Sequence, residues 1–215
     1  FTHNVTAAMN LVAHAWGDAN VGAGDRIVLT EMEHHSNIVP WYLLAQRTGA
    51  VLDWVGIDDQ GRLDREAMSA ALAREPKLLA FTHVSNVLGT VNDVASISAE
   101  AKAAGATVVI DGAQAAPRMP LDMAAIGADF YGATGHKLYG PTGIGVLWGR
   151  RELLDGMGPF EGGGSMIGKV TKDNITWAAV PTRFEAGTPP IAEAVGLGAA
   201  VECMKGVGLE NIGAH

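Results

Sequence analysis

Lys137 is the residue of this sequence whose type and position most directly indicate covalent chemistry. It ends the segment Thr134–Lys137 (TGHK), which follows the apolar run Asp129–Ala133. An amine just past a buried strand can be partly removed from water, and removal from water would lower the pKa of its ammonium from the usual value of about 10.4. The neutral amine can form an imine, so Lys137 is a candidate nucleophile, with a solvated surface lysine as the alternative.

Two polar residues follow another apolar run. Asp111 comes directly after the stretch Val108–Ile110, and its carboxylate could hold a protonated ring nitrogen through a charge-assisted hydrogen bond. A turn or helix-capping aspartate is the alternative explanation. Gln114, three residues later, could donate a hydrogen bond to a ring oxygen.

Thr6 and a pair of histidines complete the set. Thr6 precedes a run rich in Ala, Met and Leu, so we expect it to be a helix N-cap. The free N–H groups of a helix N-terminus attract phosphate, and an ordinary cap without a ligand is the alternative. His34 or His35 could stack on a planar ring, whereas a metal site is the weaker hypothesis because the H-E-x-x-H spacing is absent. A phosphate cradle, a stacking ring, an acid and a lysine are the contacts that pyridoxal phosphate (PLP) needs. Together these residues predict a PLP site.

Short apolar segments alternate with helical patterns along the chain. This alternation predicts an α/β fold, with a mainly parallel sheet that helices cover on both faces, in one large domain over residues 1–215. Ligands of such sheets bind beyond the carboxyl ends of the strands, which is where the candidate residues lie. The expected buried strands are Arg26–Leu29, Val51–Val55, Leu78–Phe81, Thr107–Ile110, Asp129–Ala133 and Ile144–Trp148. The expected helices are Ala7–Trp16, Ile38–Arg47, Asp64–Arg74, Asp93–Ala104 and Ile191–Met204, the last packed on the sheet.

Several helix ends carry their own signals. Asp64 and Asp93 are expected N-caps, and Gly49 and Gly105 stand where C-caps are expected. Cys203, the only cysteine, lies inside the last expected helix. We expect it to be a small buried residue rather than a reactive thiol.

Composition narrows the classes of function. Of 215 residues, 48% are apolar and 18% charged, which is enough for one large core. No apolar run approaches the roughly 20 residues that span a bilayer, and no signal segment opens the chain. The net charge of −8 without a basic stripe argues against nucleic acid as a partner, and the single cysteine fits the cytoplasm. Because position 1 is Phe and the sequence stops without an evident terminator, we expect a piece of a longer protein.

Six segments carry a resemblance to a known family: MEHHSNIVPW, THVSNVLGTVND, VVIDGAQAAPRMPLDM, GHKLYGPTGIGVLWG, FEGGGSMI and RFEAGTPP. They resemble the SufS-type cysteine desulfurase and selenocysteine lyase group of class V aminotransferase-like enzymes, which have the fold type I PLP architecture. The resemblance covers nearly the whole chain. It implies that Lys137 carries PLP, that Asp111 pairs with the ring nitrogen and that Gln114 contacts the ring hydroxyl. His34 resembles the stacking histidine, with His35 as the less favoured choice.

The resemblance also implies which residues contact the phosphate of PLP. The sequence departs from the family pattern at Ala7. The contacts would come from Thr6, the Ala7 backbone, Thr134 and His136, with Asn86 near cofactor and substrate. Gly187 and Thr188 resemble a loop that reaches the phosphate of a second subunit, which implies a homodimer. Ala7 stands where the family usually has an acidic residue, so only a backbone contact is expected there.

The implied function is removal of sulfur from L-cysteine, giving L-alanine and an enzyme persulfide for sulfur transfer or iron–sulfur cluster assembly, with a sulfur-acceptor protein as partner. In the family, the persulfide-forming cysteine and an arginine that binds the substrate carboxylate lie in a C-terminal domain that is absent from this sequence. Three alternatives remain: a lyase acting on L-selenocysteine, another class V enzyme, or a truncated domain that binds PLP without turnover.

Overall fold

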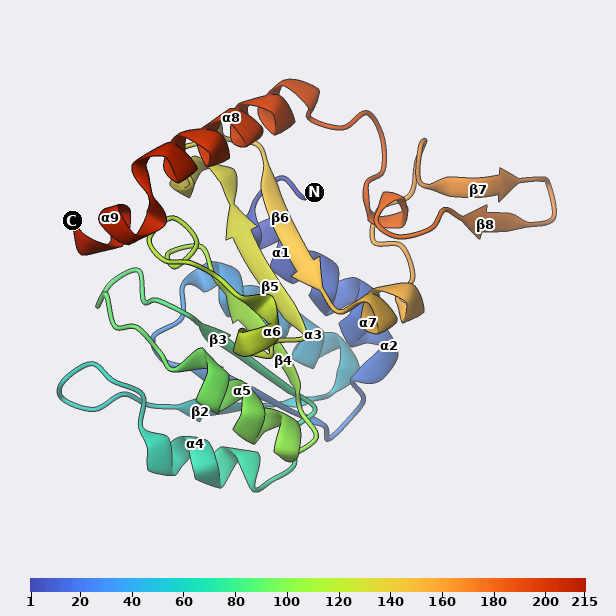
Figure 1. Ribbon diagram of the computed structural model, residues 1–215. Coiled ribbons are helices and arrows are strands. Elements are labelled where there is room, and N and C mark those ends of the chain that lie inside the picture. Colours follow the sequence, from blue (N-terminus) through green and yellow to red (C-terminus); the bar gives the residue numbers. More distant parts are fainter.

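Six strands form one sheet in the computed structural model, which describes residues 1–215 (Figure 1). Their order across the sheet is β2-β1-β3-β4-β5-β6. The first five strands along the chain are parallel and β6 runs antiparallel to β5, so the predicted mainly parallel α/β fold is confirmed. The strands are β1 (Arg26–Thr30), β2 (Val51–Val55), β3 (Leu78–Thr82), β4 (Thr107–Asp111), β5 (Phe130–Thr134) and β6 (Gly145–Gly149).

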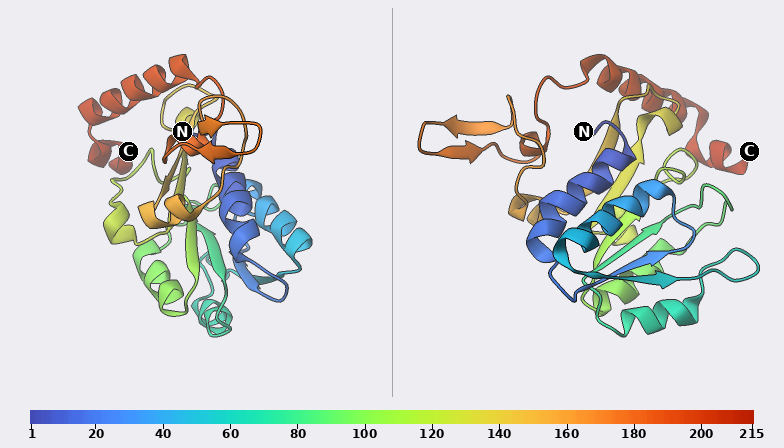
Figure 2. Two further views of the ribbon diagram at one scale, coloured as in Figure 1. Left: turned by 90° about the vertical axis from the view of Figure 1, so that its right-hand side faces the viewer. Right: turned by 180° about the vertical axis from the view of Figure 1, so that it is seen from behind.

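Alternate residues of the central strands enter two separate cores. In β3, Leu78 and Ala80 belong to the core beneath α1 (Val5–Leu11), the π-helical turn η1 (Val12–Gly17) and α3 (Val39–Thr48). Leu79 and Phe81 belong to the opposite core, beneath α4 (Arg65–Leu72), α5 (Val94–Ala103) and α6 (Met123–Ile126). The two views of Figure 2 show these helices on opposite sides of the sheet. Burial on both faces explains why these strands are continuous apolar runs.

The predicted caps are mostly confirmed. The Asp64 side chain accepts a hydrogen bond from Ala67 N at 2.9 Å, and Asp93 accepts one from Ser96 N at 3.1 Å. Gly49 ends α3 in the left-handed conformation, with φ of 80°. The C-cap of α5 is Ala104 rather than Gly105, which is the next residue and has φ of 82°.

The prediction that Thr6 caps the first helix is wrong. Asn4 is the cap: its backbone is extended, and its Oδ1 accepts a hydrogen bond from Ala7 N at 2.9 Å. Both residue types cap helices well. The chain is already helical at Val5, so Thr6 lies in the first turn and its hydroxyl is not used for capping.

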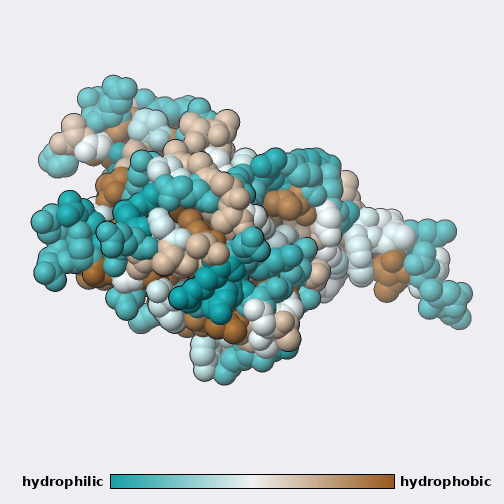
Figure 3. Space-filling model, turned by 90° about the horizontal axis from the view of Figure 1, so that it is seen from below, coloured by the Kyte–Doolittle hydropathy of each residue, from teal (hydrophilic) through white to brown (hydrophobic).

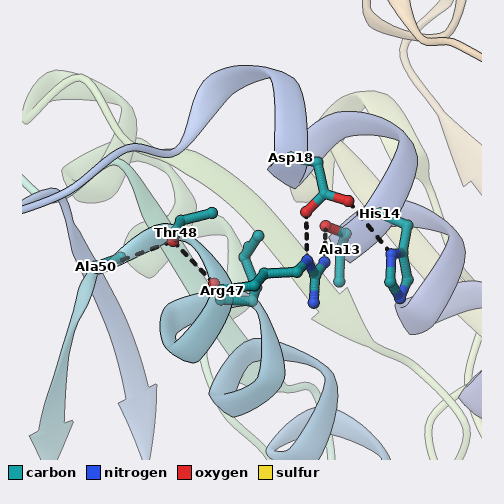
Figure 4. A network of polar contacts seen from close by, with 7 residues as sticks. Ala13, His14, Asp18, Arg47, Thr48 and Ala50 are labelled. Atoms are coloured by element: carbon teal, nitrogen blue, oxygen red, sulfur yellow. Dashed lines mark hydrogen bonds and ion pairs between the residues drawn. The ribbon is translucent and has the colours of Figure 1, made fainter.

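Arg47 of α3 fixes the helical segment that begins at Val5 and continues through η1 into α2 (Asp18–Asn20). Its Nε donates to Asp18 Oδ1 at 2.5 Å, and its Nη2 donates to the carbonyl oxygen of Ala13 at 2.8 Å (Figure 4). His14 Nδ1 lies 3.3 Å from the other carboxylate oxygen of Asp18. These contacts hold the first helix against α3, and they therefore also fix where its N-terminus lies.

The chain beyond β6 departs most from the predictions. It forms α7 (Arg151–Gly156), a hairpin of β7 (Ile167–Val170) and β8 (Ile175–Trp177), a short helix η4 (Thr182–Phe184), α8 (Ile191–Val207) and α9 (Leu209–Ala214). The hairpin was not predicted. It projects from the body of the molecule in Figures 1 and 2, and Figure 3 shows it as an arm whose surface is partly hydrophobic.

Two further predictions were wrong. Only Val55 of β2 is fully buried, because β2 is an edge strand with a neighbour on one side only. Cys203 is exposed, because α8 buries just Leu197, Ala200 and Met204.

Helix α8 packs on the turn after Lys137, and its residues Val201 and Met204 line a cavity together with Ala133 of β5 and Val146 of β6. A Cβ atom placed on Gly140 would lie 3.2 Å from Leu197 Cδ1 and 3.6 Å from Ala200 Cβ, and one placed on Gly196 would lie 3.1 Å from Pro141 Cγ. The helix therefore supports the turn that carries the candidate lysine. None of the helices in the structure has the length and apolar character needed to cross a membrane.

Candidate active site

Three adjacent strands end in polar residues at one edge of the sheet. These residues are Thr82 of β3, Asp111 of β4 and Thr134 of β5. Because Thr82 pairs with Asp111 in register and Asp111 pairs with Gly132, the three ends lie side by side. They line a cavity of about 240 Å³, close to the lower end of the range usual for small-molecule sites. The other lining residues are Asn4, Val5, Thr6, His34, Ser36, Val84, Asn86, Ala113, Gln114, His136 and Lys137.

Apart from the less favoured His35, this cavity brings together every candidate residue from the sequence except Ala7, Gly187 and Thr188. The N–H of Ala7 donates to Asn4, and Ala7 and Thr188 line a separate cavity of about 70 Å³. Gly187 has φ of 83°, and its N–H donates to Gly164 O at 2.9 Å. The roles of these three residues remain predictions, and those of Gly187 and Thr188 concern a second subunit.

Asp111 is a buried carboxylate without a strong cationic partner in the chain. Its Oδ1 accepts a hydrogen bond from Ala113 N at 2.9 Å, and its Oδ2 lies 3.3 Å from the hydroxyl of Ser36. Burial raises the pKa of this carboxyl group, while the Ala113 N–H and the positive charge of Lys137 act in the opposite direction. A buried carboxylate that lines a cavity and lacks an ion-pair partner suits a ligand with a cationic ring nitrogen.

Lys137 ends the short helix η3 (Gly135–Lys137), directly after β5. It is half-buried, and no carboxylate lies within ion-pair distance of its amine. The turn is tight, because a Cβ atom on Gly135 would lie 2.9 Å from Ile144 O. The backbone therefore leaves little freedom for the position of Lys137, and its amine is free to react with a ligand in the cavity.

The loop between β1 and α3 brings one of the two candidate histidines to the cavity. His34 lines it and His35 does not, although their ring centroids are only 5.8 Å apart. The Nδ1 atom of His34 lies 2.7 Å from Ser36 Oγ and accepts a hydrogen bond from Ser36 N at 3.2 Å. These contacts orient the imidazole, which is otherwise exposed.

Hydroxyl and imidazole groups gather where β5 meets the first helix. Thr134 is 1% exposed, and its Oγ1 lies 3.1 Å from His136 Nδ1. Thr6 reaches the same cavity from the first turn of α1. This turn can approach β5 closely because Gly132 has no side chain: a Cβ atom there would lie 2.8 Å from Val5 Cγ2. Such hydroxyl and imidazole groups near a helix N-terminus suit an anionic ligand.

Gln114 and Asn86 supply amide groups at the rim. Arg118 Nη1 donates to Gln114 Oε1 at 2.7 Å, which leaves the side-chain NH₂ group of Gln114 as a donor. Asn86 is exposed. Four kinds of contact therefore meet in one cavity: a free amine, a buried acid, an oriented imidazole and a group of hydroxyl and imidazole groups near a helix N-terminus. This is the set that PLP requires, so the residues present fit that cofactor.

Sequence reasoning missed three polar residues of the site. Asn4 was passed over because Thr6 was given the capping role. Thr82 falls one residue beyond the strand expected at Leu78–Phe81, although the end of a parallel strand was itself a sufficient signal. Ser36 lies within the segment that was singled out for its histidines. The structure contains no group of three or more His, Cys, Asp or Glu side chains arranged to hold a metal ion.

Known proteins resemble this chain in both sequence and fold. The family model described as Aminotransferase class-V matches residues 1–215. A probable cysteine desulfurase of Streptomyces coelicolor is 53% identical over all of this chain, which covers 52% of the relative. This chain also resembles the crystal structure of the cysteine desulfurase CsdA from Escherichia coli in an S-sulfonic acid form, with a TM-score of 0.95 and 39% sequence identity. The match covers 98% of this chain and 53% of the CsdA chain.

A second solved structure carries the cofactor. It is a variant of the protein C-DES with glycine covalently linked to PLP, and it matches 96% of this chain and 55% of its own, with a TM-score of 0.81 and 28% identity. The chain spans about half the length of the curated relatives it matches.

Proposed function

The chain belongs to the aminotransferase class-V family, and from this premise we propose that the whole protein is a PLP-dependent cysteine desulfurase. The observation that carries the proposal is the single cavity in which Lys137, Asp111 and His34 meet the hydroxyls of Thr6 and Thr134. Relatives named cysteine desulfurase, about 50% identical over the full chain, support the same reaction.

Bound PLP supplies an aldehyde that condenses with amines and a ring that withdraws electrons from the adjoining carbon. Lys137 would be the amine that holds the cofactor, and its free amine would move the proton at the substrate Cα. Asp111 would hold the proton on the ring nitrogen, and His34 would stack on the ring. Gln114 would donate to the ring oxygen through the NH₂ group that Arg118 leaves free.

The remaining polar groups of the cavity would hold the phosphate. Thr6, Thr134 and His136 would supply its donors, and Asn86 would lie near cofactor and substrate. The Ala7 N–H contributes only if the phosphate shares it with Asn4 Oδ1, which accepts it at 2.9 Å. The loop at Gly187 and Thr188 belongs to the phosphate site of a partner subunit in a homodimer.

In the reaction, the carbon–sulfur bond of L-cysteine breaks and the sulfur passes to a cysteine thiol, so the products are L-alanine and an enzyme persulfide. We assign that thiol and the arginine that binds the substrate carboxylate to a C-terminal domain outside these 215 residues, which form the large PLP-binding domain. We also propose a cytoplasmic protein that passes its sulfur to an acceptor protein, for uses such as iron–sulfur cluster assembly.

The test is to load the purified whole protein with PLP, reduce it with borohydride and map the modified peptide. We expect PLP on Lys137. Attachment elsewhere, or no attachment, overturns the proposal. Product assays with L-cysteine and L-selenocysteine then separate desulfurase activity, with persulfide and alanine as products, from release of selenide. The variant Lys137→Ala should bind PLP without covalent attachment, whereas Lys205→Ala, which removes an exposed lysine of α8, should load as the unmodified protein does.

A further inference from the structure

The hydroxyl of Ser36 lies between two residues of the candidate site. Its Oγ is 2.7 Å from His34 Nδ1 and 3.3 Å from Asp111 Oδ2. Ser36 is 6% exposed and lines the same cavity. Its backbone N–H also donates to His34 Nδ1, at 3.2 Å. One residue thus directs two potential donors at a single ring nitrogen.

The number of available protons determines which atom donates and which accepts in each of these contacts. The backbone N–H of Ser36 can only donate, so His34 Nδ1 must present a lone pair. The Ser36 hydroxyl has one proton and two neighbouring acceptors, and the contact to Nδ1 is the shorter by 0.6 Å. A ligand with a cationic ring nitrogen would donate a hydrogen bond to Asp111. The hydroxyl of Ser36 would then be available to donate to His34.

We infer that Ser36 is a positioning residue that holds His34 in the tautomer with its proton on Nε2. Both donors of Ser36 keep Nδ1 free of a proton and fix the plane of the imidazole. An imidazole held in this way is neutral. It can lie against a ring whose nitrogen Asp111 keeps protonated, whereas an imidazolium would repel that ring. The identity of the ring, and the donation of the hydroxyl proton to His34 rather than to Asp111, rest on the proposed function, whereas the backbone N–H of Ser36 favours the same tautomer without a ligand.

The test measures the tautomer directly in the whole protein, labelled with ¹⁵N-histidine, with and without PLP. The ¹⁵N chemical shifts distinguish a protonated from an unprotonated ring nitrogen, and His34→Gln identifies the His34 signals by their loss. In the unmodified protein we expect Nε2–H. In Ser36→Ala the loss of one hydrogen bond should raise the Nδ1–H population about threefold to tenfold relative to Nε2–H.

Two variants provide controls. Ser36→Thr keeps the hydroxyl and should restore the tautomer of the unmodified protein. Ser98→Ala makes the same change at a buried serine of α5 whose Oγ has no hydrogen-bond partner, and it should leave the signals of His34 unchanged. The absorption spectrum of bound PLP should change in Ser36→Ala and not in Ser98→Ala.

A proton on Nδ1 in the unmodified protein, or the same tautomer ratio in Ser36→Ala, overturns the inference. The two proposals fail separately. If borohydride does not attach PLP to Lys137 but Ser36→Ala still shifts the tautomer, the proposed function is wrong and the role of Ser36 stands. If PLP attaches and the tautomer does not respond, only the role of Ser36 is wrong.

Discussion

The backbone N–H of Thr82 donates to Glu33 Oε1 at 2.9 Å, which joins the loop after β1 to the end of β3. Glu33 is buried and accepts two more hydrogen bonds, from Thr30 Oγ1 at 2.5 Å and from Asn37 Nδ2 at 2.7 Å. Asn37 Oδ1 in turn accepts one from Trp41 Nε1 at 3.0 Å. The loop that presents His34 is therefore anchored on both sides of that residue to two strands and to α3.

Glu33→Gln should destabilise the protein by about 1 to 3 kcal/mol, because an amide cannot satisfy all three donors. If its oxygen faces Thr30 and Thr82, its NH₂ group meets the NH₂ group of Asn37. If it is flipped, the NH₂ group meets the N–H of Thr82. Denaturant unfolding measures the loss of stability. Because Glu33 anchors the loop that positions His34, the variant should also bind PLP more weakly.

The partner variant of this prediction changes Asn37. Asn37→Asp alone places two carboxyl groups 2.7 Å apart and should also be destabilising. Combined with Glu33→Gln, the new carboxylate accepts from both the glutamine NH₂ group and Trp41 Nε1. The double variant should therefore be more stable than either single variant. Additive losses in this double-mutant cycle would contradict the proposed arrangement of donors and acceptors.

Glu33 should also give the stability a dependence on pH. Burial raises the pKa of Glu33 from 4.5 to about 8. Between these values the folded protein holds a proton that the unfolded chain has released. The contribution of Glu33 to the free energy of unfolding is thus complete below pH 4.5 and falls as the pH rises towards 8, by at most about 1.4 kcal/mol per pH unit. The difference in unfolding free energy between the unmodified protein and Glu33→Gln should show this slope, and a difference that is flat with pH would count against it.

Much of the candidate site could be predicted from local sequence patterns. The apolar run before Asp111 and the glycine turn before Lys137 each predict a polar group at the end of a strand, and the parallel sheet then brings the two ends to the same edge. The contacts of Glu33 and Ser36 could not be predicted in this way. They join the loop after β1 to β3 and β4, so they depend on strand order and register rather than on neighbouring residues.

Exposure was the least predictable property. Cys203 lies in an apolar helix, which favours burial, but the structure covers only one narrow side of α8. Val51 is apolar and β-branched like the residues of a central strand, yet it is exposed because β2 forms the edge. The apolar residues of the β7–β8 hairpin, such as Trp177, pack on neither core. In each case the elements that pack against a helix or strand determine which of its residues are buried, and the sequence of that helix or strand does not identify those elements.

Asp111→Asn should separate stability from cofactor binding. Burial raises the pKa of the Asp111 carboxyl group, so the ionised form is costly in the protein without PLP. Asparagine keeps the contact with Ala113 N through its Oδ1 and carries no charge. The melting temperature of the cofactor-free variant should be unchanged or higher, whereas PLP affinity should fall roughly 10- to 100-fold with the loss of a charged hydrogen bond.

Asp129 supplies the control for this prediction. It is also a buried carboxylate, but its Oδ1 lies 3.1 Å from Lys102 Nζ and its Oδ2 accepts a hydrogen bond from Val108 N. Asp129→Asn should therefore lower the melting temperature and leave PLP affinity unchanged. Equal effects of the two substitutions on stability would show that Asp111 is paired as well as Asp129 is.

Gly112→Ala tests the packing that holds Asp111 in place. A Cβ atom at Gly112 would lie 1.9 Å from Tyr131 Cε1, and the Tyr131 ring cannot easily move because its hydroxyl lies 2.9 Å from His83 Nδ1 in a buried pair. The substitution should cost about 3 kcal/mol or more, at the upper end for overpacking, and should weaken PLP binding through the displaced Asp111. Gly158→Ala, where no atom lies within 4 Å, should have little effect. Because Tyr131→Ala removes the clashing atoms, adding Gly112→Ala to it should cost little more. A full additional loss in that double variant would show that the ring is not what excludes a side chain at position 112.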